Sequence, residues 1–207
     1  MIARRGICFV LAAPSGAGKS TIAQALLSEE GGMSLSVSVT TRAPRPTERE
    51  GEHYYFRDET AFARMVANGE LLEHARVFRR FYGTPRAPVI DALATGRDVL
   101  FDIDWQGFRQ LRAALPGDVV GVFVLPPSMA ALLARMRVRA GDDEEEMARR
   151  MAAAKAEIAH WPEFDYVIVN DDFDTALRRV RAILHASRLA THRQIGLSEF
   201  VASLDRG

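Results

Sequence analysis

One short segment near the start of the chain combines glycines with a lysine and three hydroxyl residues. The apolar run Ile7 to Ala12 leads into it, and a helical pattern follows. Glycines let successive backbone N–H groups turn toward one anion, and the dipole of the following helix favours negative charge. The segment therefore predicts a P-loop that binds nucleotide phosphates, with Lys19 on the outer phosphates and Ser20 on Mg²⁺. Its residues are Ala13, Pro14, Ser15, Gly16, Ala17, Gly18, Lys19, Ser20 and Thr21.

The loop is specific in spite of one departure from the usual pattern. G-x-x-x-x-G-K-[ST] begins with glycine, where this chain has Ala13. The remaining Gly16-x-Gly18-Lys19-Ser20 core would arise by chance about once in a hundred chains of this length. Lys19 is also one of only two lysines among 27 basic residues, the other being Lys155. An accidental turn is the alternative, and the flanking strand and helix patterns disfavour it.

A pair of arginines farther along the chain could bind a second phosphate. Arg42 and Arg45 lie three residues apart across a turn that Pro44 stiffens, so two planar guanidinium groups can reach one phosphate. The hydroxyls of Tyr54 and Tyr82 could add donors. Ordinary surface arginines are the alternative, and the pair alone does not decide between the two interpretations.

Composition limits the kinds of partner. The 207 residues are 48% hydrophobic and 26% charged, and 27 basic residues balance 27 acidic ones. A general nucleic-acid or membrane-surface role is disfavoured, because the chain has no global basic field. Cys8 is the only cysteine, and no apolar stretch approaches the roughly 18 residues of a membrane span, so we expect a cytoplasmic protein. Whether it is a monomer or a homo-oligomer stays open.

Apolar runs bounded by turn residues predict five strands buried on both faces. Helical patterns alternate with several of these runs, which favours a parallel sheet. Two segments break the alternation: 40–88 indicates an insertion with its own small fold, and 135–150 is densely charged, as solvated helices usually are. The segment 191–207 fits either a docked helix or a partner contact. The predicted strands are Ile7 to Ala12, Leu35 to Val39, Asp98 to Ile103, Val119 to Leu125 and Tyr166 to Val169.

Six motifs, in order along nearly the whole chain from Ile7 to Leu189, resemble the guanylate kinase family. The family implies transfer of the γ-phosphoryl group of ATP to GMP, and to dGMP, giving ADP and GDP with the help of Mg²⁺. The motifs are Ala13-Pro14-Ser15-Gly16-Ala17-Gly18-Lys19-Ser20, Ser38-Val39-Thr40-Thr41-Arg42-Ala43-Pro44-Arg45, Gly51-Glu52-His53-Tyr54-Tyr55-Phe56, Tyr82-Gly83-Thr84, Asp102-Ile103-Asp104-Trp105-Gln106-Gly107 and Ile168-Val169-Asn170-Asp171-Asp172.

The resemblance also implies a fold and its division. It implies a single α/β domain over 1–207 of the P-loop NTPase type, with three layers and a five-stranded parallel core sheet. A small GMP-binding subdomain is inserted in this core, and a mobile lid closes over the nucleotides. We expect both to move when substrates bind, because an open site would let water take the phosphoryl group. The implied ranges are 7–39, 89–134 and 151–190 for the core, 40–88 for the subdomain and 135–150 for the lid.

Substrate-binding residues follow from the same resemblance, position by position. A carboxylate such as Glu73 can accept the N1–H and N2–H₂ donors of guanine, and a hydroxyl such as Thr84 can donate to O6. Without the resemblance, Glu73 would be interpreted as a surface carboxylate. The implied GMP-binding residues are Ser38, Glu73, Thr84 and Asp104 around the base and Arg42, Arg45, Tyr54 and Tyr82 on the phosphate.

Catalytic and metal-binding residues are implied in the same way. Asn170 joins the ATP-binding residues of the loop, Ser20 would bind Mg²⁺ directly, and Asp102 would contact the hydrated ion through its water. Phosphoryl transfer needs positioning and charge neutralisation, which explains the many cations. The implied catalytic residues are Lys19, Arg42, Arg135, Arg139 and Arg150.

Two other functions stay open at this stage. A related P-loop kinase could act on a different nucleoside monophosphate or on a ribose bisphosphate. A guanylate-kinase-like domain could also serve as a non-catalytic binding module, although such modules are expected to lose the catalytic cations that this chain keeps. Val138 and Ala140 stand where the family's lid turn has glycines, so the lid geometry also stays open.

Overall fold

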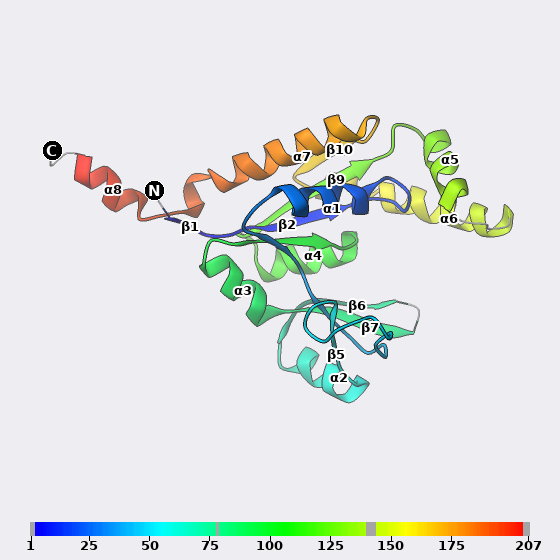
Figure 1. The fold of residues 1–207 in the computed structure, drawn as a ribbon, viewed down its shortest axis with the longest axis horizontal. Helices are drawn as coiled ribbons and strands as arrows, with labels where there is room; N and C mark the ends of the chain where they lie inside the picture. Colours follow the sequence, from blue (N-terminus) through cyan, green and yellow to red (C-terminus); the bar gives the residue numbers. More distant parts are fainter. Residues whose placement is uncertain (1–2, 78, 140–143, 205–207) are drawn as a thin grey trace.

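The computed structural model describes residues 3–77, 79–139 and 144–204, without the side chains of residues 138 and 139 (Figure 1). Its centre is a five-stranded sheet of order β10-β9-β2-β8-β3, in which all neighbouring strands are parallel. The predicted five-stranded parallel sheet is therefore confirmed. Its strands are β2 (Cys8–Ala12), β3 (Met33–Leu35), β8 (Asp98–Asp102), β9 (Val119–Leu125) and β10 (Tyr166–Val169).

The run predicted as one strand over Leu35 to Val39 is divided in the structure. Leu35 ends β3 in the core sheet, whereas Val39 belongs to β4 (Ser38–Thr40) in a second sheet. β3 is an edge strand with β8 as its partner, and Leu35 keeps 49% of its surface exposed. The prediction of one strand buried on both faces was wrong here, because the edge of the sheet offers cover on one side only.

Two layers of helices cover the core sheet, because successive strand side chains point to opposite faces. In β2, Phe9 and Leu11 pack in one apolar cluster, while Cys8 and Val10 pack in the other. The P-loop follows the carboxyl end of this central strand, the usual ligand position in parallel α/β sheets. The covering helices are α1 (Lys19–Glu29) and α7 (Phe173–Arg188) on one face, and α3 (Arg86–Ala94) and α4 (Trp105–Ala114) on the other.

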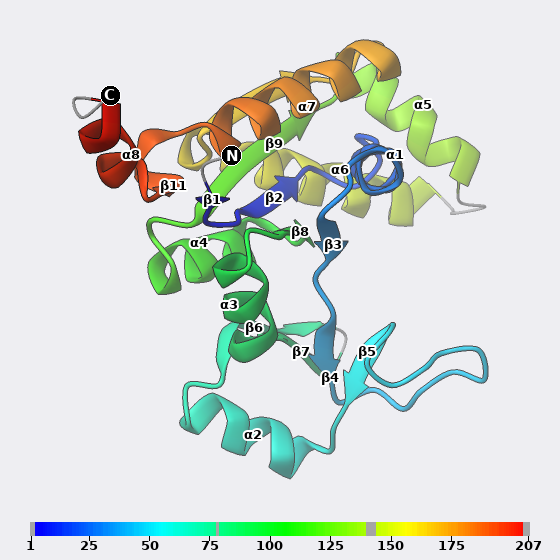
Figure 2. The same ribbon diagram turned by 60° about the vertical axis from the view of Figure 1, so that its left-hand side comes forward.

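A small subdomain lies on one side of the core (Figure 2). Its four-stranded sheet has the order β5-β4-β7-β6, with β4 and β5 parallel and the other pairs antiparallel. Val39, Phe62 and Leu71 form its own apolar core. The elements besides β4 are β5 (Tyr54–Phe56), α2 (Glu59–Ala67), β6 (Leu71–Val77) and β7 (Arg80–Pro85).

A pair of helices, α5 (Met129–Arg139) and α6 (Glu144–Ile158), lies at one end of the core (Figure 1). Leu132 and Met136 of α5 pack against Met147 of α6. The predicted lid, 135–150, takes in the last turns of α5 and the first turns of α6. Its residues 140–143 lie outside the described residues, and so does the position of Ala140 in the lid turn.

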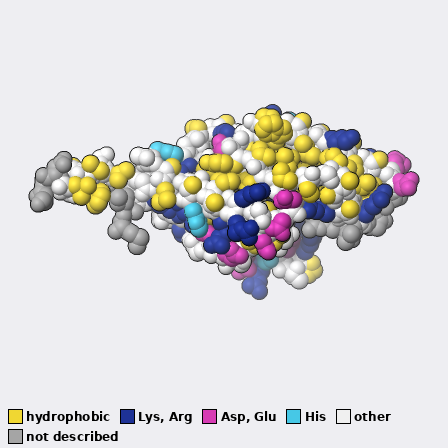
Figure 3. Space-filling view, turned by 90° about the horizontal axis from the view of Figure 1, so that it is seen from above, with side chains coloured by type: hydrophobic (Ala, Val, Ile, Leu, Met, Phe, Trp, Pro, Cys, Tyr) yellow, Lys and Arg dark blue, Asp and Glu magenta, His cyan; other side chains and the backbone are white. Residues whose placement is uncertain are grey.

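The chain ends in a helix that projects from the core (Figure 3). Phe200, Val201 and Leu204 of α8 (Leu197–Leu204) are exposed, and none of the eight residues of this helix is buried by the described part of the chain. Every helix in the described ranges is too short or too polar to cross a bilayer. The remaining elements are β1 (Ala3–Arg4), η1 (Trp161–Glu163), η2 (Thr191–Arg193) and β11 (Gln194–Ile195), of which β1 and β11 pair antiparallel.

Candidate active site

The P-loop lies between β2 and α1, and its glycines adopt backbone conformations that other residues disfavour. Gly16 has a φ of 88° and Gly18 a φ of 97°, both in the left-handed region. Space also limits Gly18, because a Cβ there would lie 2.4 Å from Nδ2 of Asn170. α1 begins at Lys19, directly after Gly18, so the free N–H groups of the first turn are available to an anion.

A cavity of about 310 Å³ at this loop collects groups that can bind a nucleotide and a cation. The Lys19 ammonium contacts the Asp102 carboxylate at the end of β8. The Ser20 hydroxyl, at 3.5 Å, donates to Oδ2 of the same carboxylate. The residues that line the cavity are Ala13, Pro14, Ser15, Gly16, Gly18, Lys19, Ser20, Asp102, Asp104 and Glu157.

The oxygen donors of this cavity fit Mg²⁺. The ion usually keeps several waters and binds through one or two protein ligands together with substrate phosphates. Ser20 and Asp102 supply a hydroxyl and a carboxylate that lie within hydrogen-bond distance of each other. Among the described residues no cluster of three or more carboxylate, histidine or cysteine ligands forms a closed metal site. An open site completed by phosphates and water is the arrangement that these residues suit.

The back of the P-loop is held by residues from the neighbouring elements. The buried Asn170 side chain donates from Nδ2 to the carbonyl of Ala17 at 2.8 Å. Arg135 donates to the carbonyl of Asn170 at 3.0 Å, and Arg150 approaches the Ser15 hydroxyl at 3.4 Å. Two of the predicted lid arginines therefore already contact the loop or its support. The side chain of the third, Arg139, lies outside the described part of the structure.

Glu157 lines the same cavity and was not predicted from the sequence. Its carboxylate accepts the backbone N–H of Ser15, and burial raises its pKa although that bond and the charge of Lys19 oppose the shift. The signal in the sequence is its position seven residues after Arg150 on α6, two turns along one face. Both side chains therefore reach the same residue of the loop.

The subdomain contributes a buried carboxylate with a hydroxyl donor beside it. Glu73 on β6 and Thr84 on β7 are cross-strand neighbours, and the Thr84 hydroxyl donates to Oε1 of Glu73 at 2.7 Å. Glu73 is 7% exposed and Thr84 is 1% exposed. Burial raises the pKa of Glu73, and the charge of Asp104 raises it further, whereas the hydrogen bonds from Thr84 lower it. Such a carboxylate can accept from a ligand that brings N–H donors.

Asp104 connects this carboxylate to the P-loop cavity. It is the N-cap of α4 and accepts the backbone N–H groups of Gln106 and Gly107 at 2.9 and 3.0 Å. It also lines the P-loop cavity. On the other side, Glu73 lies so near the first turn of α4 that a Cβ on Gly107 would be 3.3 Å from its Oε2. The first turn of α4 therefore stands between the two subsites.

Arg42, which was predicted to bind the phosphate of GMP, forms an ion pair with Glu48 in this structure. Arg42 donates to Oε1 of Glu48 at 2.7 Å, and the Arg45 backbone N–H donates to Oε2 at 2.8 Å. The hydrogen bond from Arg42 is the main reason that the pKa of Glu48 falls to about 2. The Arg42 guanidinium lies 5.3 Å from the centre of the Tyr54 ring. Glu48 was missed because nothing in the sequence marks one of several glutamates in this turn.

The other predicted acceptor residues lie around this pair. The rings of Tyr54 and Tyr82 meet edge to face at 6.0 Å. Ser38 begins β4 and pairs in register with Tyr54, and it is half-buried. The Arg45 side chain is exposed. Arg42, Tyr54 and Tyr82 thus come together as predicted, while Arg45 is in contact with Glu48 through its backbone.

The parallel sheet and the P-loop cavity define a P-loop protein that binds nucleotides. Comparisons with known proteins give the family. The guanylate kinase profile matches residues 5–187. The chain is 62% identical over 203 residues to a guanylate kinase of Gluconobacter oxydans (strain 621H), covering 98% of each chain, and 60% identical over 201 residues to one of Granulibacter bethesdensis, covering 97% and 94%.

A solved structure agrees with the sequence relatives. The crystal structure of guanylate kinase from Anaplasma phagocytophilum superimposes with a TM-score of 0.76 at 40% identity, covering 98% of this chain and 96% of that one. The chain belongs to the guanylate kinase family. The resemblance found in the six sequence motifs is confirmed.

Proposed function

We propose that the protein transfers the γ-phosphoryl group of ATP to GMP, giving ADP and GDP, as a cytoplasmic enzyme. Membership of the guanylate kinase family supports this reaction. The single observation that carries the choice of acceptor is the buried pair Glu73 and Thr84 beside the first turn of α4, whose N-cap Asp104 lines the P-loop cavity. A GMP molecule whose base binds there would have its phosphate directed toward ATP in the P-loop cavity.

The chemistry of the pair supports guanine over adenine. Guanine presents N1–H and N2–H₂ donors, which the Glu73 carboxylate can accept, and an O6 acceptor, to which the Thr84 hydroxyl would donate by turning from Glu73. Adenine has an acceptor at N1 and a donor at N6, so on this edge it would leave the buried carboxylate without its donors. Sites that depend on buried hydrogen bonds of this kind can discriminate by about 10⁴-fold or more.

The donor site is proposed to act mainly through charge. Ser20 directly, and Asp102 through water, would hold Mg²⁺, which would supply positive charge for the nucleotide phosphates. Lys19 would exchange its contact with Asp102 for the outer phosphates, and Arg135 and Arg150 would add positive charge from the lid helices. Arg139, at the end of α5, is proposed to join them.

We propose that the phosphate of GMP replaces Glu48 as the hydrogen-bond partner of Arg42. The guanidinium is already beside Tyr54 and Tyr82, so the exchange needs a change of partner and little movement. Arg45 would then add a second guanidinium, and closure of the subdomain and lid would exclude water from the phosphoryl group. No covalent enzyme intermediate is needed, because GMP itself supplies the attacking phosphate oxygen.

An acceptor panel tests the proposal. ADP formation from ATP and Mg²⁺ is measured with GMP, dGMP, AMP, UMP, CMP and ribose phosphates at equal concentration. We expect turnover with GMP and dGMP, and at least about 10³-fold lower kcat/KM for AMP. Preference for any other acceptor would refute the assignment. GMP binding without turnover would instead support the non-catalytic binding module.

A further inference from the structure

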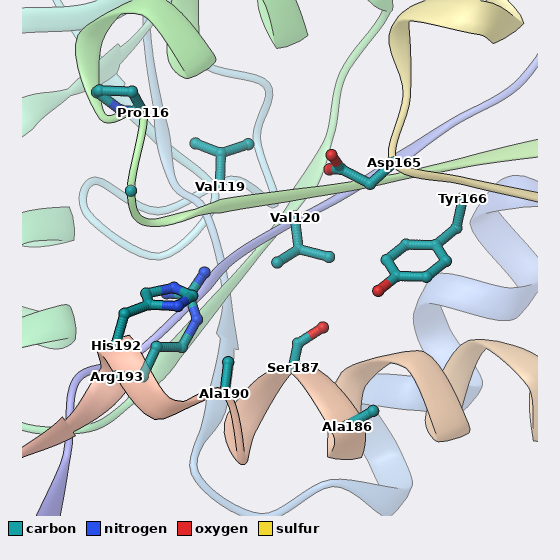
Figure 4. Close-up of a pocket in the computed structure, with 11 residues that line it drawn as sticks. Pro116, Val119, Val120, Asp165, Tyr166, Ala186, Ser187, Ala190, His192 and Arg193 are labelled. Atoms are coloured by element: carbon teal, nitrogen blue, oxygen red, sulfur yellow. The ribbon is translucent and has the colours of Figure 1, made fainter.

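A second large pocket lies at the opposite end of the sheet from the P-loop (Figure 4). The P-loop follows the carboxyl end of β2, whereas this pocket is bordered by the first residues of β9 and β10 and by the last turn of α7. Its volume is about 490 Å³. It is lined by Pro116, Gly117, Val119, Val120, Asp165, Tyr166, Ala186, Ser187, Ala190, His192 and Arg193.

The acidic groups in and near this pocket already have cationic partners. Asp118 receives two hydrogen bonds from Arg5, each of 2.7 Å. Asp165 pairs with Arg112 and also accepts the backbone N–H of Gly121 at 2.8 Å. Asp165 is therefore balanced by an arginine outside the pocket lining, whereas Asp118 is shared between Arg5 at 2.7 Å and Arg193 at 3.9 Å.

Arg193 lines the pocket and has only long contacts with acceptors in the described part of the chain. Its side chain is only 4% exposed, and its closest acceptors are the Gly6 carbonyl at 3.4 Å and the Asp118 carboxylate at 3.9 Å, both measured from Nη1. Its buried Nε has no hydrogen-bond partner within the described residues. Burial lowers the pKa of Arg193 although Asp118 opposes the shift. A buried guanidinium with so few close acceptors is destabilising until an acceptor is supplied.

Two backbone contacts fix the main chain at Arg193. The Arg5 N–H donates to the Arg193 carbonyl at 2.8 Å, and Gln194, the next residue, pairs with β1. Arg193 is thus fixed at the end of the pocket, beside His192 (Figure 4). An oxyanion in the pocket is the group that could satisfy it without changing the fold.

The remaining walls indicate what carries that oxyanion. Val120 from the sheet faces the alanines 186 and 190 on the helix side, and these three residues form an apolar slot, whereas Val119 points to the opposite face of the sheet (Figure 4). The Ser187 and Tyr166 hydroxyls lie along this slot. We propose that this pocket binds an organic anion, with a carboxylate or phosphate group against Arg193 and His192 and a flat apolar body between Val120 and the alanines.

Binding of three naphthalene probes tests the proposal. 2-Naphthoate and 2-naphthyl phosphate carry the two kinds of oxyanion on the same body, and 2-naphthamide is the neutral control. Backbone amide chemical shifts of the full chain are followed during titration, so that binding is located as well as measured. We expect shifts at Gly117, Gly121 and Ala186, and an affinity about tenfold to hundredfold higher for at least one anion than for the amide.

Variants connect the binding to this pocket. Arg193→Met should abolish the preference for the anions over the amide, and circular dichroism checks that the variant folds. Ala186→Trp should block the slot from an exposed position, while Ala182→Trp, one turn earlier on α7 and outside the pocket lining, should leave binding unchanged. If Arg193→Met does not fold, Ala186→Trp and its control decide. Equal affinity for the amide, shifts confined to other surfaces, or full binding by Ala186→Trp would overturn the proposal.

Discussion

Replacing Glu73 by glutamine is the sharpest test of how the acceptor base is recognised. The carboxylate is buried and already accepts from Thr84, so guanine would meet it with two further N–H donors. A glutamine amide at this position presents one acceptor and one donor, so one guanine donor would face another donor. A hydrogen bond to a charged group contributes about 1.5–3 kcal/mol, so loss of one would cost about that much. At about 1.4 kcal/mol for each factor of ten, kcat/KM for GMP should fall about 10- to 10²-fold.

Steady-state kinetics with GMP and AMP measures the effect. We expect kcat/KM for AMP to stay constant or rise, because the amide can donate to adenine N1. Glu70→Gln is the matched control, since Glu70 is an exposed carboxylate just before β6. Glu73→Gln that retains more than about a tenth of the wild-type kcat/KM for GMP would refute the assigned role.

The same substitution has a stability signature that separates binding from folding. Burial holds the pKa of Glu73 above its usual value of 4.5, so its charged form is less stable in the folded than in the unfolded chain. The free energy of unfolding therefore falls as the pH rises from 4.5 through the raised pKa. We expect Glu73→Gln to raise Tm at pH 7 and to leave it nearly unchanged below pH 4.5. A variant less stable than wild type at pH 7 would contradict this reasoning.

Three further outcomes are expected. Lys19→Met should lower kcat by about 10³-fold or more without lowering Tm. Lys155 is an exposed lysine of α6, so Lys155→Met should leave the kinetics unchanged. Equal activities of the two variants would refute the role of Lys19. Glu48→Gln should lower KM for GMP, because the phosphate no longer competes with a carboxylate for Arg42. Glu52→Gln should leave this KM unchanged. A raised KM in Glu48→Gln would contradict the replacement of Glu48 by the phosphate. Burial raises the pKa of Glu30, but hydrogen bonds from Arg188, His185 and Arg181 outweigh it and hold this pKa at about 2. Glu30→Gln should therefore lower Tm at pH 7, and the difference should disappear as the pH falls from 4.5 to 2; a constant difference in urea or thermal melts would refute it.

The core of the fold could be predicted because its signals are local. Near-continuous apolar runs gave four core strands close to their observed bounds, and Gly16 and Gly18 have the positive φ values that a phosphate loop needs. The fifth, over Leu35 to Val39, was misjudged because apolarity does not say which sheet a residue joins. That choice depends on pairing with β8 or with β5 and β7, which are distant in the chain.

The candidate site could be predicted only in part, for a related reason. Residue types and spacing indicated the loop and the paired arginines, while Glu73, Thr84 and Asp104 needed the family resemblance. Glu48 and Glu157 were missed, because a carboxylate that holds a cation or a backbone N–H looks like any other until the fold places its partner. Whether Asn170 contacts ATP directly stays a prediction, and its contact in this structure is the Ala17 carbonyl.

Both anion pockets share one electrostatic arrangement, which has a consequence for how binding energy is used. Lys19 is paired with Asp102, and Arg42 is paired with Glu48, so each proposed phosphate must replace a carboxylate. The two exchanges differ in what becomes of the released group. Asp102 lies beside Ser20, where a hydrated cation arriving with ATP would offer it a new partner, whereas no comparable cation accompanies GMP. At the proposed site, release of Glu48 would therefore make GMP binding less favourable, while the base end, already ordered by Glu73 and Thr84, would keep its selectivity. We expect the base contacts to be the main source of discrimination and the phosphate contacts to strengthen as the site closes.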